Sequence, residues 1–258
     1  MSPDYANILV DVTDRVATVT VNRPPLNVLD KDTLIEIRQA LGKLKEDSTV
    51  TLVVLRTAGN RFFCVGVDVE QHLPEHAPKT LKAFNDVFKA LLELDKPVIA
   101  VVQGSALGGG CELAFTCDMV IAAESAKFGQ PEIQVGAVPT VAAAFMHHFI
   151  GPKRTFELCL TGKNISAAEA ERMGLITRAV PDGELEEAVN QLVSKLKEYS
   201  PVMLSYVRRA IYASLSADFM AALKKVTELY LESLETTEDA TEGLKAFLEK
   251  RKPVWKGK

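Results

Sequence analysis

The 258-residue chain has few of the residues that build metal centres and disulfide frameworks, with four cysteines and four histidines. The cysteines are Cys64, Cys111, Cys117 and Cys159. They form no Cys-x-x-Cys pair and no framework spacing, which indicates reduced thiols used in packing. His72 and His76 could share a helical face, but Pro74 between them disfavours a regular helix. We therefore expect neither a metal site nor a disulfide.

The chain also lacks a strong charge imbalance and a long apolar run. Its 30 basic and 34 acidic residues give a net charge of −4, so no basic footprint for nucleic acid is present. No apolar run reaches the ~18 residues of a membrane span, and the N-terminus carries no signal or transit pattern. We expect a cytoplasmic protein that binds neither nucleic acid nor a membrane. Its composition, with 47% hydrophobic and 25% charged residues, is ordinary for a globular enzyme.

Hydrophobic periodicity predicts an α/β fold. Strands and helices alternate through the first two thirds of the chain, which is typical of parallel βαβ units. From about residue 182 onward the β signal ends and only helices are predicted. The predicted β segments are 8–21 (a hairpin turning at Asp14-Arg15), 50–55, 97–102 and 118–123. The predicted helices are 32–44, 81–94, 111–116, 184–199, 202–214, 219–234 and 237–251.

The most informative stretch is Gly104-Ser-Ala-Leu-Gly-Gly-Gly-Cys-Glu112, between a predicted strand and a predicted helix. Glycine allows the backbone to approach a ligand closely, and a helix N-terminus presents unpaired N–H groups with a partial positive charge. This arrangement suits an oxyanion, either a phosphate or the enolate of an activated carbonyl. The spacing fits neither the dinucleotide fingerprint nor the P-loop, which excludes a Rossmann-type NAD enzyme. Alone, such a stretch could equally be a structural turn.

A second carboxylate follows in Phe128-Gly-Gln-Pro-Glu132, after the buried segment 118–123. The chain can thus return Glu132 to the neighbourhood of Glu112, where paired carboxylates in a partly dry site act as acid and base. The alternative is two solvated surface glutamates. Upstream, Gly66 precedes an exposed N–H, and one N–H there could share an oxygen with one from the glycine triplet.

Taken together, these motifs resemble the enoyl-CoA hydratase/isomerase (crotonase) superfamily. Phe63-x-x-Gly-x-Asp68, the Gly104–Leu113 stretch and Phe128–Glu132 occur in the order and spacing of that family. Further matches extend the resemblance over essentially the whole chain, at 22–27, 160–162, 167–175 and 242–251. The resemblance implies a spiral of repeated ββα units over residues 1–195. It also implies a C-terminal helical region, 196–258, through which the family forms trimers and often dimers of trimers. No internal sequence repeat is detectable.

The resemblance also implies roles for individual residues. The backbone N–H groups of Val67 and Gly109 would form an oxyanion hole for the oxygen of an acyl-CoA thioester. Glu112 would help activate the oxygen of a water molecule, and Glu132 would exchange a proton with the α-carbon. Water would thus add to a 2-enoyl-CoA to give a 3-hydroxyacyl-CoA, with no cofactor other than the CoA of the substrate. The implied substrate-binding residues are Cys64, Gly66, Asp68, Ala106, Leu107, Gly108, Pro139, Thr140, Phe247 and Lys250. Phe247 could equally well be part of a helix core, and Lys250 could equally well lie on a solvated face.

One segment departs from the family pattern. Many straight-chain hydratases continue after the second Glu with Gly-x-x-Pro-Gly-Ala-Gly-Gly-Thr-Gln-Arg-Leu. Here the chain reads Gly136-Ala-Val-Pro-Thr-Val-Ala-Ala-Ala-Phe-Met-His147 and is one residue shorter before Gly151. Because this segment borders the reacting acyl carbons in the family, acyl specificity stays open. Apolar Val141, Phe145 and Met146 would be compatible with the wider pocket of a cyclic dienoyl-CoA hydratase.

Two further alternatives remain. Isomerases of the family often keep only the second carboxylate, so retention of Glu112 and Glu132 favours a hydratase, although some members with both also isomerise. The alternative of another class is a CoA- or RNA-binding scaffold without turnover. The acidic pI and both retained carboxylates count against it.

Overall fold

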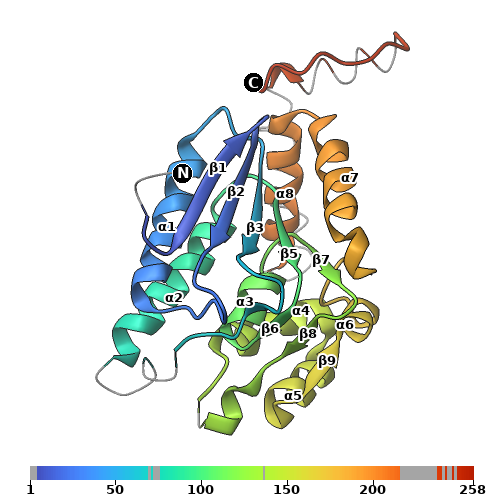
Figure 1. Cartoon of the computed structure of the whole chain (residues 1–258). Coiled ribbons are helices and arrows are strands. Elements are labelled where there is room, and N and C mark those ends of the chain that lie inside the picture. Colours follow the sequence, from blue (N-terminus) through green and yellow to red (C-terminus); the bar gives the residue numbers. More distant parts are fainter. Residues whose placement is uncertain are drawn as a thin grey trace. The chain divides into compact units, whose positions relative to one another are not determined.

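The computed structural model describes residues 5–68, 71, 76–135, 137–215, 237–239, 242, 246 and 249–258 (Figure 1). The chain divides into two compact units. The first comprises residues 1–94 and 98–189, and the second comprises residues 95–97 and 190–258. The first unit carries the sheets and the candidate site, while the described part of the second is mainly helical.

The first unit is built on two sheets. The larger sheet has the order β1-β2-β3-β5-β7-β10 and the smaller has the order β4-β6-β8-β9. The strands of the larger sheet are β1 (Ile8–Thr13), β2 (Val16–Val21), β3 (Leu52–Thr57), β5 (Val98–Val102), β7 (Met119–Ala123) and β10 (Arg178–Val180). Those of the smaller sheet are β4 (Phe62–Cys64), β6 (Ser105–Leu107), β8 (Lys127–Gly129) and β9 (Asn164–Ser166). The β1–β2 hairpin and the β8–β9 pair are antiparallel, and the other pairs are parallel.

From β3 to β8, consecutive strands alternate between the two sheets, which produces the repeated ββα units. β3 enters the larger sheet and β4 the smaller before α2, and β5 and β6 do the same before α3. β7 and β8 repeat the pattern before the short helical turns that follow Gly129. The chain therefore winds as the predicted spiral. Each turn ends at the smaller sheet, where Gly66, Gly108 and Glu132 follow strands β4, β6 and β8 closely.

The helical elements with described bounds are α-helices, 3₁₀ turns and a π-helical segment. The α-helices are α1 (Lys31–Glu46), α2 (Ala77–Leu92), α3 (Gly109–Phe115), α4 (His147–Ile150), α5 (Pro152–Thr161), α6 (Ala167–Met173), α7 (Leu185–Lys197) and α8 (Pro201–Leu215). The 3₁₀ turns are η2 (Pro131–Val135) and η4 (Asp182–Glu184), and the π-helix is η3 (Ala142–Met146). Local chemistry sets several ends, because Asp30 caps α1 and Ser166 with Glu169 forms a capping box on α6.

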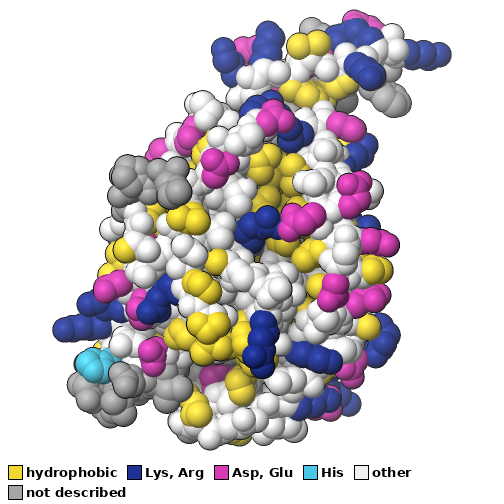
Figure 2. All heavy atoms as spheres, viewed as in Figure 1, with side chains coloured by type: hydrophobic (Ala, Val, Ile, Leu, Met, Phe, Trp, Pro, Cys, Tyr) yellow, Lys and Arg dark blue, Asp and Glu magenta, His cyan; other side chains and the backbone are white. Residues whose placement is uncertain are grey.

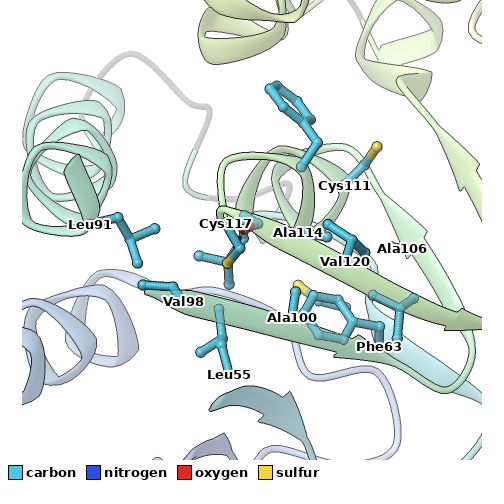
Figure 3. Close-up of a cluster of buried hydrophobic side chains, with 14 of the residues drawn as sticks. Leu55, Phe63, Leu91, Val98, Ala100, Ala106, Cys111, Ala114, Cys117 and Val120 are labelled. Carbon is cyan, nitrogen blue, oxygen red and sulfur yellow. Dashed lines mark hydrogen bonds between the residues drawn. The ribbon is translucent and has the colours of Figure 1, made fainter. Parts of the chain in front are cut away.

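The hydrophobic core fixes α3 in place. Leu55 of β3, together with Val98 and Ala100 of β5, belongs to the same buried cluster as Ala114 and Cys117 at the end of α3 (Figure 3). Every residue of α3 is buried, and β5 is buried along its whole length, as expected of a parallel strand covered on both faces. The helix that carries Glu112 thus rests on close-packed core rather than on a surface loop.

The predicted hairpin, the helices near residues 32–44 and 184–199 and the buried strands are confirmed. The helix after the glycine triplet begins at Gly109 rather than at Cys111, and α2 begins at Ala77 rather than at Leu81. The predicted helix 219–234 and most of 237–251 lie outside the described residues. No described helix combines the length and the apolar character of a membrane span. On the face drawn in Figure 2, basic and acidic side chains are interspersed.

Candidate active site

A cavity of about 410 Å³ in the first unit brings together both predicted glutamates. Glu112 comes from α3 and Glu132 from the 3₁₀ turn η2, twenty residues later. Apolar side chains of α2, including Leu81 and Phe84, form part of the wall. The cavity also meets Gly66, Val67, Gly108, Gly109 and Thr140. It therefore combines acidic groups, backbone N–H groups and an apolar wall.

Two backbone segments approach each other at this cavity. Gly66 has φ +102°, and a Cβ built there would lie 3.1 Å from the Leu107 oxygen and 3.2 Å from the Gly109 nitrogen. Hydrogen bonds from Leu29 N to Gly66 O and from Asp68 N to Leu29 O hold the backbone on either side of Val67. Only glycine allows this contact, because any side chain at position 66 would separate the two segments.

The N–H groups of Val67 and Gly109 have no hydrogen-bond acceptor within the described part of the chain. Gly109 is the first residue of α3, where helix geometry leaves the N–H unpaired and the helix dipole is positive. Two unpaired donors on adjacent segments at one cavity can bind a single oxygen that gains negative charge.

Each glycine of the triplet packs against a different group. A Cβ at Gly110 would lie 2.3 Å from the Cys64 carbonyl oxygen, and one at Gly109 would lie 3.0 Å from the Phe84 ring. At Gly108, where φ is +53°, a Cβ would lie 2.6 Å from Glu132 Oε1. The triplet therefore keeps α3 close to strand β4, keeps the cavity open and leaves room for the second carboxylate.

Glu112 is buried and anchored by the opposite wall of the cavity. Its side chain is 2% exposed, and Oε1 accepts a hydrogen bond of 2.7 Å from the backbone N–H of Ala142 at the start of η3. Burial raises the pKa of Glu112 to about 8. The negative charge of Glu132 adds to this rise, while backbone N–H bonds from Ala142 and Val141 oppose it.

Glu132 keeps one oxygen without a partner. Its side chain is 9% exposed, and Oε2 is buried with no hydrogen-bond partner among the described residues. Burial raises the pKa of Glu132 to about 7. A buried carboxylate oxygen without a partner is costly, so this atom is placed to bind a water molecule or a substrate proton.

Comparison with known proteins agrees with this arrangement. A family model described as enoyl-CoA hydratase/isomerase matches residues 11–258. The chain belongs to the enoyl-CoA hydratase/isomerase family. Its relatives include the short-chain-enoyl-CoA hydratase of Clostridium acetobutylicum, 37% identical over 95% of this chain and 96% of the relative. They also include the crotonyl-CoA hydratase of Syntrophomonas wolfei, 34% identical over 96% and 97% of the two chains.

Solved structures show the same fold. The crystal structure of an enoyl-CoA hydratase from Bacillus anthracis has a TM-score of 0.91 with this chain at 33% identity. The match covers 98% of this chain and all of that one. This similarity confirms the mixed α/β class and the spiral of ββα turns that the sequence and its family resemblance predict.

The remaining predicted residues lie in different places. Cys64 and Ala106 are fully buried and do not line the cavity, and neither does half-buried Leu107 or Asp68. Pro139 lines a neighbouring apolar groove, and Lys250 is exposed in the second unit. Phe247 lies outside the described residues. Val141, Phe145 and Met146, which would be compatible with a wider pocket for a ring substrate, do not line the cavity, and Met146 is fully buried in the core.

Sequence reasoning missed two contributors to the site. Phe84 of α2 lies against Gly109, but its helical spacing indicated only core packing. Ala142 donates to Glu112 through its backbone N–H, so the identity of residue 142 does not indicate this contact in the sequence.

The cysteines do not supply a nucleophile. All four are free thiols, and burial raises the pKa of Cys64 to about 12 and that of Cys111 further above its usual range. A thiol that stays protonated is a poor nucleophile. No cluster of three or more His, Cys, Asp or Glu side chains suited to a metal ion occurs in the described residues.

Proposed function

We propose that the protein is an enoyl-CoA hydratase, which adds water across the double bond of a 2-enoyl-CoA thioester to give a 3-hydroxyacyl-CoA. The observation that carries this proposal is the meeting of two buried carboxylates and two unpaired backbone N–H groups at one cavity. The names of the relatives support it. Retention of both carboxylates favours hydration over double-bond isomerisation.

In the proposed reaction, the thioester oxygen accepts hydrogen bonds from the N–H groups of Val67 and Gly109. Negative charge builds on this oxygen as the enolate forms, so the two donors bind the transition state more tightly than the substrate. One such donor typically contributes ~10²–10³-fold to the rate. Because the donors belong to the backbone, the side chain of residue 67 is free to vary.

The two glutamates handle the water and its protons. Glu112 takes a proton from the water molecule as its oxygen bonds to the β-carbon, and Glu132 delivers a proton to the α-carbon. The pair thus holds one proton before and after the step, and the added atoms are those of one water molecule. Burial raises the pKa of Glu112 to about 8 and that of Glu132 to about 7, so the pair binds a single proton between them near neutral pH. The reaction proceeds from the form of the pair in which Glu132 carries this proton and Glu112 is ionised.

The test is hydration of crotonyl-CoA, followed by loss of its absorbance and by mass spectrometry of the product. We expect a mass gain of one water, and a ~10²–10⁴-fold lower rate in Glu132→Gln with butyryl-CoA binding retained. Glu124→Gln, a change at an exposed glutamate, is the matched control. Full activity in Glu132→Gln would remove the assignment. A moved double bond without mass gain would show an isomerase, and binding without turnover would show a scaffold.

We also propose a cytoplasmic trimer or dimer of trimers that assembles through residues 196–258 and uses no cofactor beyond the CoA of its substrate. Helix α8 supports the assembly, because Val207 and Ile211 are 55% and 56% exposed on its surface. Sedimentation analysis measures the mass of the assembly. Activity that survives extensive dialysis against a chelator would agree with catalysis that needs no added cofactor.

A further inference from the structure

An apolar groove of about 340 Å³ lies beside the cavity that holds Glu112 and Glu132. Its walls include Ile133 of η2, Ala143 of η3 and three residues of α5, Phe156, Cys159 and Leu160. Segment 137–139 connects these walls, and His147 and Thr155 are polar members of the lining. Nothing proposed above for the reaction uses this groove.

The groove and the cavity share a thin wall. Ala137 and Val138 line both spaces, and both side chains are small. Within η2, Glu132 and Gln134 line the cavity, whereas Ile133 between them lines the groove. The Val138 side chain is 69% exposed, so few contacts oppose its displacement. A chain of carbon atoms that begins beside Glu132 therefore has a short path over Val138 into the groove.

The lining suits hydrocarbon and little else. No Lys, Arg, Asp or Glu lines the groove, so it offers no charged partner for a phosphate. The Thr155 hydroxyl donates to the Gly151 carbonyl, which satisfies its hydrogen within the protein. Phe156 and Leu160 are each 64% exposed and leave apolar surface that a ligand could cover.

The groove is built partly by the segment that departs from the common family sequence. Pro139, Ala143 and His147 all lie in 136–150, where small glycines and a Gln-Arg pair are replaced. In this chain the replacement removes a charged side chain and supplies apolar ones. The composition of the segment thus matches an apolar ligand next to the reacting carbons.

We propose that this groove binds the distal carbons of longer acyl chains whose thioester group lies in the cavity, with the chain passing over Val138. The inference rests on the proposed acyl-CoA site, and it names the substrate class as 2-enoyl-CoA thioesters of medium and long chain. Short substrates such as crotonyl-CoA end before the groove and do not use it.

The first experiment measures equilibrium dissociation constants of saturated acyl-CoAs, from butyryl-CoA through octanoyl-CoA to dodecanoyl-CoA. Saturated ligands need no turnover. We expect dodecanoyl-CoA to bind at least about tenfold more tightly than butyryl-CoA, since each buried CH₂ adds to affinity. Ala143→Phe fills the groove and should remove most of this gain, while changing butyryl-CoA affinity less than about twofold. Ala144→Phe is the matched control, because Ala144 is exposed on the same helical segment and does not line the groove.

A second experiment uses the unaltered protein, so it does not depend on how a variant folds. An acyl-CoA that carries a diazirine at the end of a long chain is irradiated when bound, and the labelled residues are mapped by mass spectrometry. We expect labels on α5, at Phe156, Cys159 or Leu160. Labels on α2 at Ala77 or Leu81 would place the chain end elsewhere and overturn the proposal.

Other outcomes are equally decisive. Equal loss of affinity in Ala143→Phe and Ala144→Phe, or no preference for longer chains, would overturn the groove as an acyl site. A changed sedimentation mass in Ala143→Phe with unchanged affinities would assign the surface to a subunit contact instead. Failure of the proposed function would give a different result. The wild-type protein would then leave crotonyl-CoA unhydrated, whatever its affinities for the saturated acyl-CoAs.

Discussion

The two carboxylates of the cavity stand on walls of different construction. Glu112 belongs to α3, in which every residue is buried and which rests on the core between strands. Glu132 belongs to a 3₁₀ turn, followed by an irregular stretch and a π-helix, and Val135 in that turn is 57% exposed. The first wall fixes atoms to within close-packing tolerance, whereas the exposed residues of the second wall, such as Val135, can change at little cost to the core.

Backbone N–H groups of one wall couple it to the other. The Ala142 N–H at the start of the π-helix donates to Glu112. The wall of η2 and η3, called the variable wall below, therefore helps to orient the carboxylate of the α3 wall, called the fixed wall. π-helical turns are uncommon and occur mostly at functional sites. We therefore expect the wall of α3 to bind the thioester oxygen and the water, and the wall of η2 and η3 to supply the second carboxylate and to contact the acyl chain.

Gly110→Ala should break the fixed wall and have the largest effect. The new Cβ would lie 2.3 Å from the Cys64 carbonyl oxygen, so α3 must move away from β4 and carry Gly109 and Glu112 with it. We expect the free energy of unfolding to fall by about 3 kcal/mol and hydration to be lost. Urea unfolding measures the first and the crotonyl-CoA assay the second.

Gly42→Ala in α1 is the control for Gly110→Ala, because a Cβ at Gly42 meets no atom within 4 Å. It should stabilise the helix by about 0.5–1 kcal/mol. Equal stability of Gly110→Ala and the wild type would show that α3 does not pack against β4 as tightly as described.

Glu112→Gln should change how stability depends on pH. Burial raises the pKa of Glu112 from 4.5 to about 8, so the folded protein keeps a proton that the unfolded chain releases. The free energy of unfolding therefore falls as pH rises between these two values, and is constant above about pH 8. Glu112→Gln removes the contribution of Glu112 to this slope and leaves the smaller one of Glu132, whose pKa burial raises to about 7, so the variant should be more stable than the wild type at high pH by an amount on the order of a few kcal/mol. Denaturant unfolding at several pH values tests it, and parallel curves for variant and wild type would contradict the buried, protonated state.

The pH dependence of kcat/KM should depend on the carboxyl groups of both walls, Glu112 and Glu132. Because burial raises the pKa of Glu132 to about 7 and that of Glu112 to about 8, kcat/KM should peak between these values. At lower pH no carboxylate is left to take the proton of water, and at higher pH no carboxyl is left to protonate the α-carbon. Each limb should fall about tenfold per pH unit. A profile measured with crotonyl-CoA that stays flat from about pH 5 to about pH 10 would exclude the paired acid–base role.

The fixed wall could be predicted from the sequence far better than the variable one. The glycine triplet, the strand before it and the helix after it each leave a pattern within a few residues, so the sequence predicts Glu112 on a helix, although this helix begins at Gly109, two residues earlier than predicted. The three-residue strands β4, β6, β8 and β9 are too short to show periodicity. The spiral therefore stayed an expectation from family resemblance, without a repeat in the sequence to derive it.

The variable wall misled the sequence interpretation for a physical reason. Phe145 would be compatible with a wider acyl pocket, but its ring packs edge-on against Phe149, with 5.2 Å between centroids, and does not line the cavity. An apolar residue on an irregular helix can face either the core or the cavity, and composition does not distinguish the two. The backbone donor at Ala142 was beyond reach for a similar reason, since every residue except proline carries an N–H.

Changes at Thr140 test the difference between the fixed and the variable wall, and their expected effect is the smallest. It lines the cavity just before the π-helix η3 of the variable wall, so its side chain should shape the acyl site without entering the chemistry. Thr140→Gly should change crotonyl-CoA hydration less than about tenfold and improve turnover of the branched 2-methylcrotonyl-CoA, because removing one or two carbon-sized groups from a pocket shifts specificity by ~1–3 kcal/mol. Thr140→Val keeps the volume and removes the hydroxyl, so it should match the wild type on both substrates. A loss in Thr140→Val as large as that of Glu132→Gln would instead show that the hydroxyl contacts the reacting water, so Thr140 would share in the chemistry with Glu132.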